Sequence, residues 1–230
     1  MIILRKGEER GRADHGWLKS FHTFSFADYH DPSEMGYGDL RVINDDRVEP
    51  SKGFGTHSHR DMEIVSYVVE GELAHKDSMG NTSTITRGDV QRMSAGTGVL
   101  HSEYNPSSSS LVHFLQIWIL PEKKGIEPGY EQKHFSEEDK LNRLLLIVSK
   151  SGREGSVSLN QDADIYAALL DGAEASHRMG PGRIAYLHVV KGDIRLNGLD
   201  LSSGDGAKIR NEDTLFLSGK GELLLFDLKG

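Results

Sequence analysis

Short apolar runs, each about the length of a β-strand and bounded by turn-forming residues, recur along most of this chain. Clear examples are residues 40–44, 64–69, 112–120, 144–148, 184–190 and 223–228. Most of the 26 glycines fall singly between such runs, which is typical of tight turns between strands. Helical periodicity is scarce, and only residues 136–145 favour one short helix, with Ser136 as its N-cap and Asp139 closing a capping box. The pattern predicts an all-β fold with few short helices.

A weak internal repeat indicates two related lobes. Residues 66–72 (SYVVEGE) are echoed by residues 187–193 (LHVVKGD), and the Gly-Asp turn at 88–89 is echoed at 204–205. In both copies a strand runs into a glycine turn and a second turn follows within 20 residues. The simplest interpretation is two β-barrel lobes, with the seam in the polar segment around residues 132–155. We therefore predict an N-terminal domain over residues 1–133 and a C-terminal domain over residues 134–230.

Composition restricts the functions that this chain can have. The formal net charge is -8 and no cluster of Lys and Arg stands out, so we do not expect direct nucleic-acid binding. The chain has no cysteine, so any metal must be held by nitrogen and oxygen. The first 12 residues carry charges where a signal peptide needs an apolar stretch, and no run approaches the roughly 18 apolar residues of a membrane span. We expect a cytoplasmic protein with no membrane partner.

Two pairs of potential metal ligands stand at a spacing of two residues. His57 and His59 form the first pair, and His101 and Glu103 form the second, directly after the glycine-containing turn at residues 95–98. Residues i and i+2 of a strand point to the same face, so each pair aims both side chains into one space. Two such pairs on neighbouring strands would bring four ligands to one point.

Three neutral imidazoles and one carboxylate suit a divalent first-row metal. An octahedral ion held by four protein ligands keeps two positions for water, substrate or dioxygen, which is typical of a catalytic site. The second lobe lacks this set. Aligning Gly192 with Gly71 places Arg178 and Gly180 where His57 and His59 would stand. We predict no metal in the C-terminal lobe.

The residues around these pairs resemble a known family. Residues 53–71, with His57, His59 and Glu63, resemble the first cupin motif, and residues 88–105, with His101 and Asn105, resemble the second. The His-Ser-Glu variant at 101–103, the segment FSFADY at 24–29 and Asp-Pro at 31–32 resemble the pirin family over nearly the whole chain. The resemblance is strongest to bacterial pirin-like proteins described as quercetin 2,3-dioxygenases.

This resemblance implies a bicupin, in which two antiparallel cupin β-barrels face each other and only the N-terminal one holds metal. The implied ligands are His57, His59, His101 and Glu103. Iron(II) is the implied metal, and zinc, nickel, cobalt, manganese and copper are alternatives. Typical cupins take their carboxylate from the first motif, five residues after the second histidine. Here Glu63 follows His59 by four residues and stays a competitor of Glu103.

The second cupin motif usually contains a proline, and Ser94 stands in its place here. We expect this replacement to alter the turn and to leave the ligands as they are.

The implied activity is cleavage of the central ring of a flavonol such as quercetin by dioxygen, with release of carbon monoxide. Glu103 would be the catalytic base as well as a ligand. Two other hypotheses stay open. A non-enzymatic, redox-sensing regulatory protein would bind a protein partner. A different cupin enzyme, such as a sugar isomerase or a thiol dioxygenase, is less favoured because only Arg60 lies near the ligands to hold a phosphate.

Apolar side chains could line a pocket beside the metal, although plain core packing is their commoner role. The candidates are Phe24, Phe26, Phe54, Met93 and Trp118. Trp17 and Tyr29 flank the pirin-like segment, which could cover the barrel mouth. The remaining histidines are expected on the surface or in packing, with His113 as the one that could face the barrel; the others are His15, His22, His30, His75, His134, His177 and His188.

Overall fold

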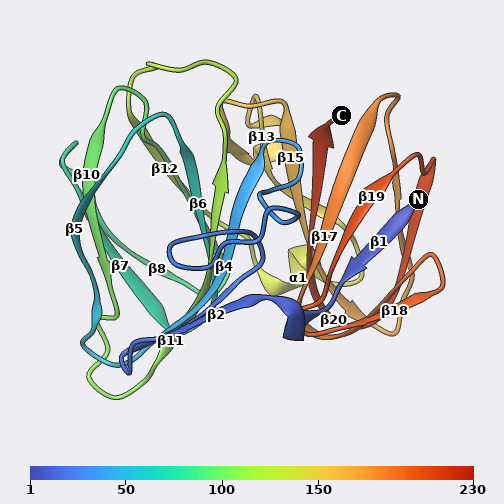
Figure 1. Ribbon diagram of the computed structural model, residues 1–230, viewed down its shortest axis with the longest axis horizontal. Coiled ribbons are helices and arrows are strands. Elements are labelled where there is room, and N and C mark those ends of the chain that lie inside the picture. The colour runs from blue at the N-terminus through green and yellow to red at the C-terminus, as the bar shows by residue number, and fades with distance from the viewer. The chain divides into compact units, whose positions relative to one another are not determined.

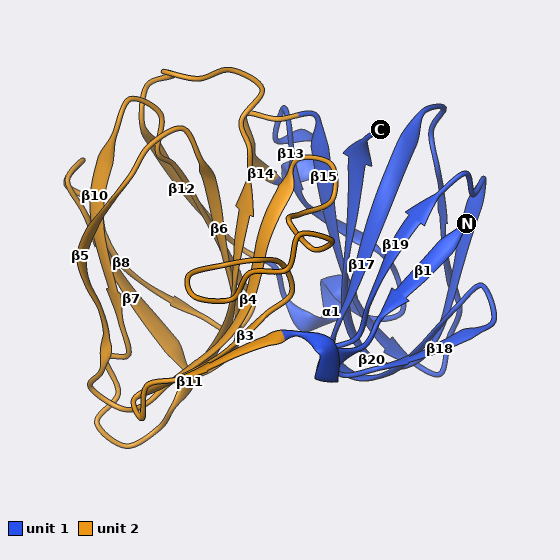
Figure 2. Ribbon diagram, viewed as in Figure 1, with its two compact units in different colours: residues 1–10, 135–156, 162–230 blue, residues 11–134, 157–161 orange.

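The computed structural model describes residues 1–230, which form two compact units (Figure 2). Unit 1 contains residues 1–10, 135–156 and 162–230, and unit 2 contains residues 11–134 and 157–161. The all-β prediction is confirmed, because antiparallel sheets make up both units and the only α-helix is four residues long. Each unit includes a segment that is distant in sequence from the rest of it, and the predicted division after residue 133 stays a prediction.

Unit 2 is built from two antiparallel sheets that face each other (Figure 1). The larger sheet has the order β12 (Gly129–His134), β9 (Asp89–Ser94), β6 (Glu63–Glu70), β11 (Val112–Ile119), β4 (Leu40–Val48), β3 (Leu18–His22) and β2 (Gly11–Asp14). The smaller sheet has the order β5 (Gly53–His59), β10 (Val99–Tyr104), β7 (Glu72–Asp77) and β8 (Thr82–Thr86). The two-residue strand β14 (Val157–Ser158) contacts β9 and β12.

The interior of unit 2 has two apolar clusters with a row of polar side chains between them. Residues paired directly across antiparallel strands point to the same face, so each such set runs across several strands. An apolar cluster fills one end with Leu18, Val48, Val68, Leu73, Ile85, Val112 and Phe114. A second apolar cluster at the other end contains Ile64, Met93, Ala95 and Val99. Between them a buried polar row crosses the larger sheet through the successive pairs of His22 with Asn44, Asn44 with Gln116, and Gln116 with Ser66.

Unit 1 has one large antiparallel sheet. Its order is β1 (Ile2–Arg5), β19 (Gly206–Arg210), β17 (Arg183–Leu196), β20 (Thr214–Lys229), β15 (Ala163–Asp171) and β13 (Leu145–Ser149), with β16 (Ala175–Arg178) beside β20 and β18 (Leu199–Ser202) beside β17. Leucine, isoleucine, valine and alanine side chains from these strands form its core, among them Leu187, Ile194 and Leu225.

Helical structure is confined to short pieces. In α1 (Glu137–Lys140), the Ser136 hydroxyl accepts a hydrogen bond from the Asp139 backbone amide at 3.1 Å, so the predicted N-cap is confirmed. The 3-10 helices span Gly7–Glu9 and Arg153–Gly155. No helix has the length and apolar character that a membrane crossing requires.

The loop after β10 is fixed by one fully buried side chain, Asn105. Its amide donates to the backbone carbonyls of Val48 at 3.0 Å and Ser110 at 2.8 Å, and its carbonyl accepts from the Ser107 amide at 3.0 Å. A single side chain therefore ties the β10–β11 loop to the end of β4.

Replacing Asn105 with alanine should lower the free energy of unfolding by about 1–3 kcal/mol, because the buried carbonyl of Val48 and the partly buried carbonyl of Ser110 lose their donor. Thermal unfolding followed by circular dichroism measures the effect. Ser108→Ala, an exposed change in the same loop, should stay within about 0.5 kcal/mol of the parent. Equal melting temperatures for the two variants would contradict this role of Asn105.

Candidate metal centre

The antiparallel pair of β5 and β10 places the predicted ligands. His101 lies directly opposite His57, and Val99 lies opposite His59. A bulge between His101 and Glu103 shifts the register, so that Glu103 lies opposite Phe54. The three histidines share one face of the sheet, as the two-residue spacing predicts.

Gly53 allows β5 to approach β10 closely. A Cβ atom at this position would lie 2.3 Å from both the Glu103 carbonyl oxygen and the Tyr104 Cα, which are backbone atoms that cannot turn aside. Two residues along the same strand, a Cβ at Gly55 would meet nothing within 4 Å. The close approach of the two strands therefore depends on Gly53.

The three imidazoles stand in mutual contact. Ring centroids are 4.4 Å apart for His57 and His101, 4.8 Å for His57 and His59, and 4.9 Å for His59 and His101. Their nearest ring nitrogens all lie within 4.8 Å of one another. The structure thus brings together three of the four side chains that the sequence singles out.

The three imidazoles of this trio have ring nitrogens whose lone pairs could bind a metal. Nδ1 of His57 lies 2.8 Å from the Gly55 carbonyl, which can only accept, so Nδ1 carries the proton and Nε2 keeps its lone pair. Nε2 of His59 and both nitrogens of His101 have no hydrogen-bond partner in the protein. Burial, helped by the neighbouring imidazoles, lowers the pKa of His59 to about 4 and that of His101 to about 3. Neutral, unpartnered imidazoles fit a divalent metal.

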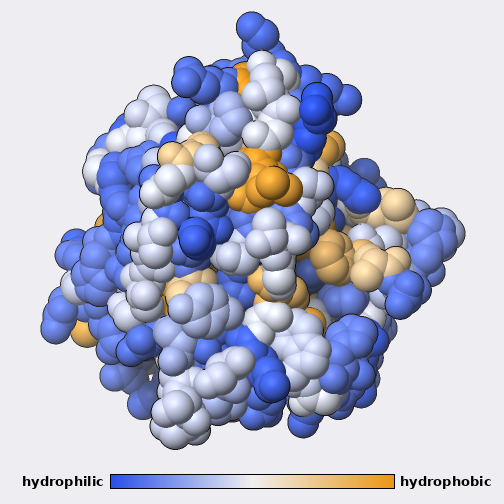
Figure 3. All heavy atoms as spheres, turned by 90° about the vertical axis from the view of Figure 1, so that its left-hand side faces the viewer, coloured by the Kyte–Doolittle hydropathy of each residue, from blue (hydrophilic) through white to orange (hydrophobic).

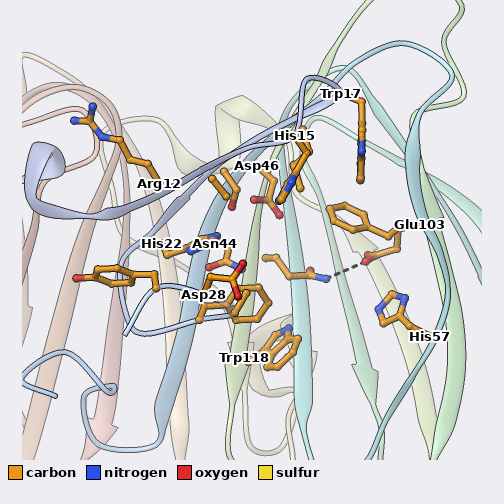
Figure 4. A pocket seen from close by; sticks show the side chains of 18 residues that line it. Arg12, His15, Trp17, His22, Asp28, Asn44, Asp46, His57, Glu103 and Trp118 are labelled. Carbon is orange, nitrogen blue, oxygen red and sulfur yellow. Dashed lines mark hydrogen bonds between the residues drawn. The ribbon is translucent and has the colours of Figure 1, made fainter. Parts of the chain in front are cut away.

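Glu103 is buried and held from the opposite sheet. The amide of Gln116 donates to its Oε2 at 2.9 Å, the bond drawn as a dashed line in Figure 4. The hydroxyl of Ser66 approaches its Oε1 at 3.3 Å. Burial raises the pKa of Glu103 to about 7, and the nearby charge of Asp46 raises it further, whereas the two hydrogen bonds oppose the shift. The carboxyl group is therefore close to a balance between its protonated and ionised forms at neutral pH.

His75 joins the site from β7. It lies directly opposite Glu103, and it forms a second potential ligand group with His101 and Glu103. Its Nε2 lies 3.1 Å from an oxygen of Asp77, and its Nδ1 has no partner. The sequence analysis grouped His75 with packing histidines; the available signal was its own two-residue spacing from Asp77. Glu103 is thus linked to the histidine trio through His101, which belongs to both groups.

Glu63 points elsewhere. Its fully buried carboxylate accepts from the Ser94 hydroxyl at 2.9 Å and from the Asn160 backbone amide at 3.1 Å. It belongs to neither group of potential ligands. Glu63, the competitor of Glu103 for the carboxylate ligand, instead fastens the segment 157–161 within unit 2.

A cavity of about 710 Å³ opens beside His57 and Glu103. It is lined by Arg12, Ala13, His15, Trp17, Leu18, Ser20, His22, Phe26, Ala27, Asp28, Tyr29, Asn44, Asp46, Phe54, His57, Glu103, Gln116 and Trp118. Of the five apolar candidates, Phe26, Phe54 and Trp118 line it, whereas Phe24 is core and Met93 packs in the apolar cluster with Val99.

Aromatic rings give the cavity its walls. Trp17 meets Phe54 edge to face at 5.4 Å between ring centroids, and Phe26 meets Trp118 in the same way at 5.4 Å. Such walls suit a flat, apolar ligand. The outer surface over β5 and β10 is mostly hydrophilic, with small separate apolar spots (Figure 3). His113 points away from the cavity and lies 2.7 Å from Asp45.

Unit 1 has a cluster of charged side chains next to Arg178, the residue aligned with His57. His177 contacts the carboxylate of Asp227 at 2.7 Å, and Arg183 donates to the same carboxylate. Arg178 ends β16. The absence of metal in this lobe stays a prediction.

Comparisons with known proteins agree with this architecture. The family model described as Pirin matches residues 4–119, and the one described as quercetinase C-terminal cupin domain matches residues 146–228. A quercetin 2,3-dioxygenase of Escherichia coli K12 is 49% identical over 99% of both chains, and a pirin-like protein of Caulobacter vibrioides is 38% identical over 99% of both. The crystal structure of the Escherichia coli pirin YhhW in complex with nickel(II) matches with a TM-score of 0.95 and 48% identity, covering 100% of this chain and 99% of that one.

Gly53→Ala should weaken binding of a divalent metal by about 10-fold or more, because the added methyl group forces β5 away from β10. Gly55→Ala is the matched control and should bind as the parent does, since its Cβ meets open space. Titration with nickel(II), followed by isothermal calorimetry, compares the three proteins. Parent-like affinity in Gly53→Ala would show that the site tolerates a wider strand spacing.

Proposed function

Because this chain belongs to the pirin family, we propose that it is a metal-dependent dioxygenase that opens the central ring of flavonols such as quercetin and releases carbon monoxide. The observation that carries the proposal is the aromatic-walled cavity of about 710 Å³ that reaches both His57 and Glu103. A flavonol is flat, and its enol oxygen can approach this end of the cavity while its rings contact the walls. The relatives that are named quercetin 2,3-dioxygenases support the choice of substrate.

In this proposal His57, His59, His101 and Glu103 hold one divalent metal. Support comes from the unpartnered ring nitrogens of His59 and His101. It also comes from the nickel(II) complex of the Escherichia coli pirin. We propose iron(II) as the native ion, with other divalent ions able to occupy the site. When bound, the metal supplies a Lewis acid and a template for the enol oxygen of the substrate.

The side chains of the cavity bind and orient the substrate. Trp17 and Phe54 form one aromatic pair, and Phe26 and Trp118 form the other. Contact with these rings removes water from the flavonol and from the buried carboxyl of Glu103. Without competing water, hydrogen bonds at the reacting end are stronger than in solution.

Glu103 is the base for the enol hydroxyl of the substrate, in addition to its role as a ligand. In the metal-free protein, burial raises the pKa of this carboxyl to about 7, so its surroundings favour uptake of a proton by Glu103. We assign the proton to Oε1, because Oε2 receives the shorter hydrogen bond, from Gln116. The Ser66 hydroxyl can then turn to the Gln116 carbonyl oxygen, which lies 2.9 Å away.

His101→Ala should lower oxygen consumption with quercetin by at least about 100-fold, because a buried ligand is lost. Oxygen uptake and quercetin absorbance are followed together in preparations of known metal content. His30→Ala, which changes an exposed histidine outside the cavity, should retain activity. Uptake that is unaffected by His101→Ala would rule out the proposed function. Bound metal without any flavonol turnover would favour the regulatory alternative.

Metal binding to the metal-free protein at pH 6 should release about one proton more in the parent than in Glu103→Gln. Below its pKa of about 7 the buried Glu103 is protonated, and it must lose this proton to become a ligand. His59 and His101, with pKa values of about 4 and 3, are already neutral at pH 6 and release none. Calorimetry in buffers of different ionisation enthalpy measures the difference. Equal proton release in both proteins would remove Glu103 from the ligand set.

A further inference from the structure

Two buried hydrogen-bond acceptors in the cavity, Asn44 and Asp46, have no assigned contact with metal or substrate in the chemistry described above. Asn44 is 3% exposed and Asp46 is 4% exposed, and both line the cavity. Oδ1 of Asn44 and Oδ1 of Asp46 have no hydrogen-bond partner in the protein. The side chain of Ser20 bonds to Asp46, which leaves the second oxygen of that carboxylate without a donor.

Their place relative to the metal end follows from the register of the larger sheet. Asn44 lies directly opposite Gln116, whose amide contacts Glu103. Neighbouring strands are about 4.8 Å apart, and two residues along a strand span about 6.6 Å. Asn44 and Asp46 therefore lie close enough to Gln116 for one flavonol to reach from the metal end of the cavity to both of them. Figure 4 shows both across the cavity from His57.

Packing does not explain these two side chains. A buried acceptor without a donor destabilises the fold, and apolar residues of similar size would avoid this cost. Burial also raises the pKa of Asp46 to about 7, and its one hydrogen bond, from Ser20, opposes this shift without cancelling it. Polar groups kept at such a cost are typical of ligand-binding sites, where the ligand supplies the missing partner.

The chemistry of the two atoms selects the partner. Oδ1 of Asn44 can only accept, and the ionised carboxylate of Asp46 also accepts, so the complementary ligand group is a donor. The aromatic rings of Phe26 and Trp118 line the same cavity, which favours a donor that is attached to an aromatic ring. A phenolic hydroxyl has both properties.

We infer that Asn44 and Asp46 form a second subsite, which accepts hydrogen bonds from phenolic hydroxyls of the substrate that are remote from its enol oxygen. The site therefore selects polyhydroxylated flavonols over 3-hydroxyflavone, which carries only the enol hydroxyl. This inference rests on the proposed function for the class of ligand, and the subsite determines selectivity within that class.

The test compares the binding of quercetin and of 3-hydroxyflavone to the nickel-loaded protein without oxygen. Quenching of tryptophan fluorescence reports binding, because Trp17 and Trp118 both line the cavity. In Asp46→Leu and in Asn44→Leu, the preference for quercetin over 3-hydroxyflavone should fall by about 10-fold. The melting temperature of Asp46→Leu should stay at or above that of the parent, because an unpartnered acceptor is removed.

Asp45→Asn is the matched control, because Asp45 precedes Asp46 on β4 and points to the other face, where it contacts His113. This control should keep the preference of the parent. An unchanged preference in both leucine variants would overturn the inference, whether or not the protein turns over flavonols. Loss of preference in these variants without oxygen consumption by any of the proteins would support the subsite and reject the dioxygenase.

Discussion

The pairing of β5 with β10 is the contact on which the candidate site depends. The pair is close because Gly53 has no Cβ to collide with the backbone of β10. This register sets His57 opposite His101. On its other edge β10 pairs with β7, which brings His75 opposite Glu103. Strand β10 therefore carries two potential ligands, His101 and Glu103, and each lies opposite a histidine on a neighbouring strand.

The opposite sheet completes the site through its buried polar row. Ser66 and Gln116 reach across the interior of unit 2 to the carboxyl of Glu103, between two apolar clusters that supply the packing. Buried polar groups stabilise a fold only when they are satisfied, and this row is satisfied at one end and incomplete at Asn44. The unpartnered acceptor of Asn44 thus lowers the stability of the fold on the sheet that faces the candidate metal site. Functional sites are where a protein is expected to break the rule that buried polar groups are paired.

Much of the candidate site could be predicted because its ligands stand in pairs on single strands. The period of two residues is local, so the common face of His57 and His59 follows from the sequence alone. The partners of Glu103 could not be found in this way. Ser66 and Gln116 lie 37 and 13 residues from it, and their contact depends on which strands pair and in which register. Glu63 shows the same limit, because its partner Asn160 is 97 residues away.

The first strand of unit 1 is synthesised long before the strand with which it pairs. Strand β1 pairs with β19, and Ile2 lies opposite Ile209. At a translation rate of about 5–20 residues per second, β1 waits roughly 10–40 seconds for its partner to leave the ribosome. Both sheets of unit 2 are synthesised by residue 134, so they can assemble during this interval. A nascent chain that stalls before Gly206 therefore carries β1 without its partner, together with a unit 2 whose residues have all been made. The unpaired edge of β1 is then free to pair with a neighbouring chain.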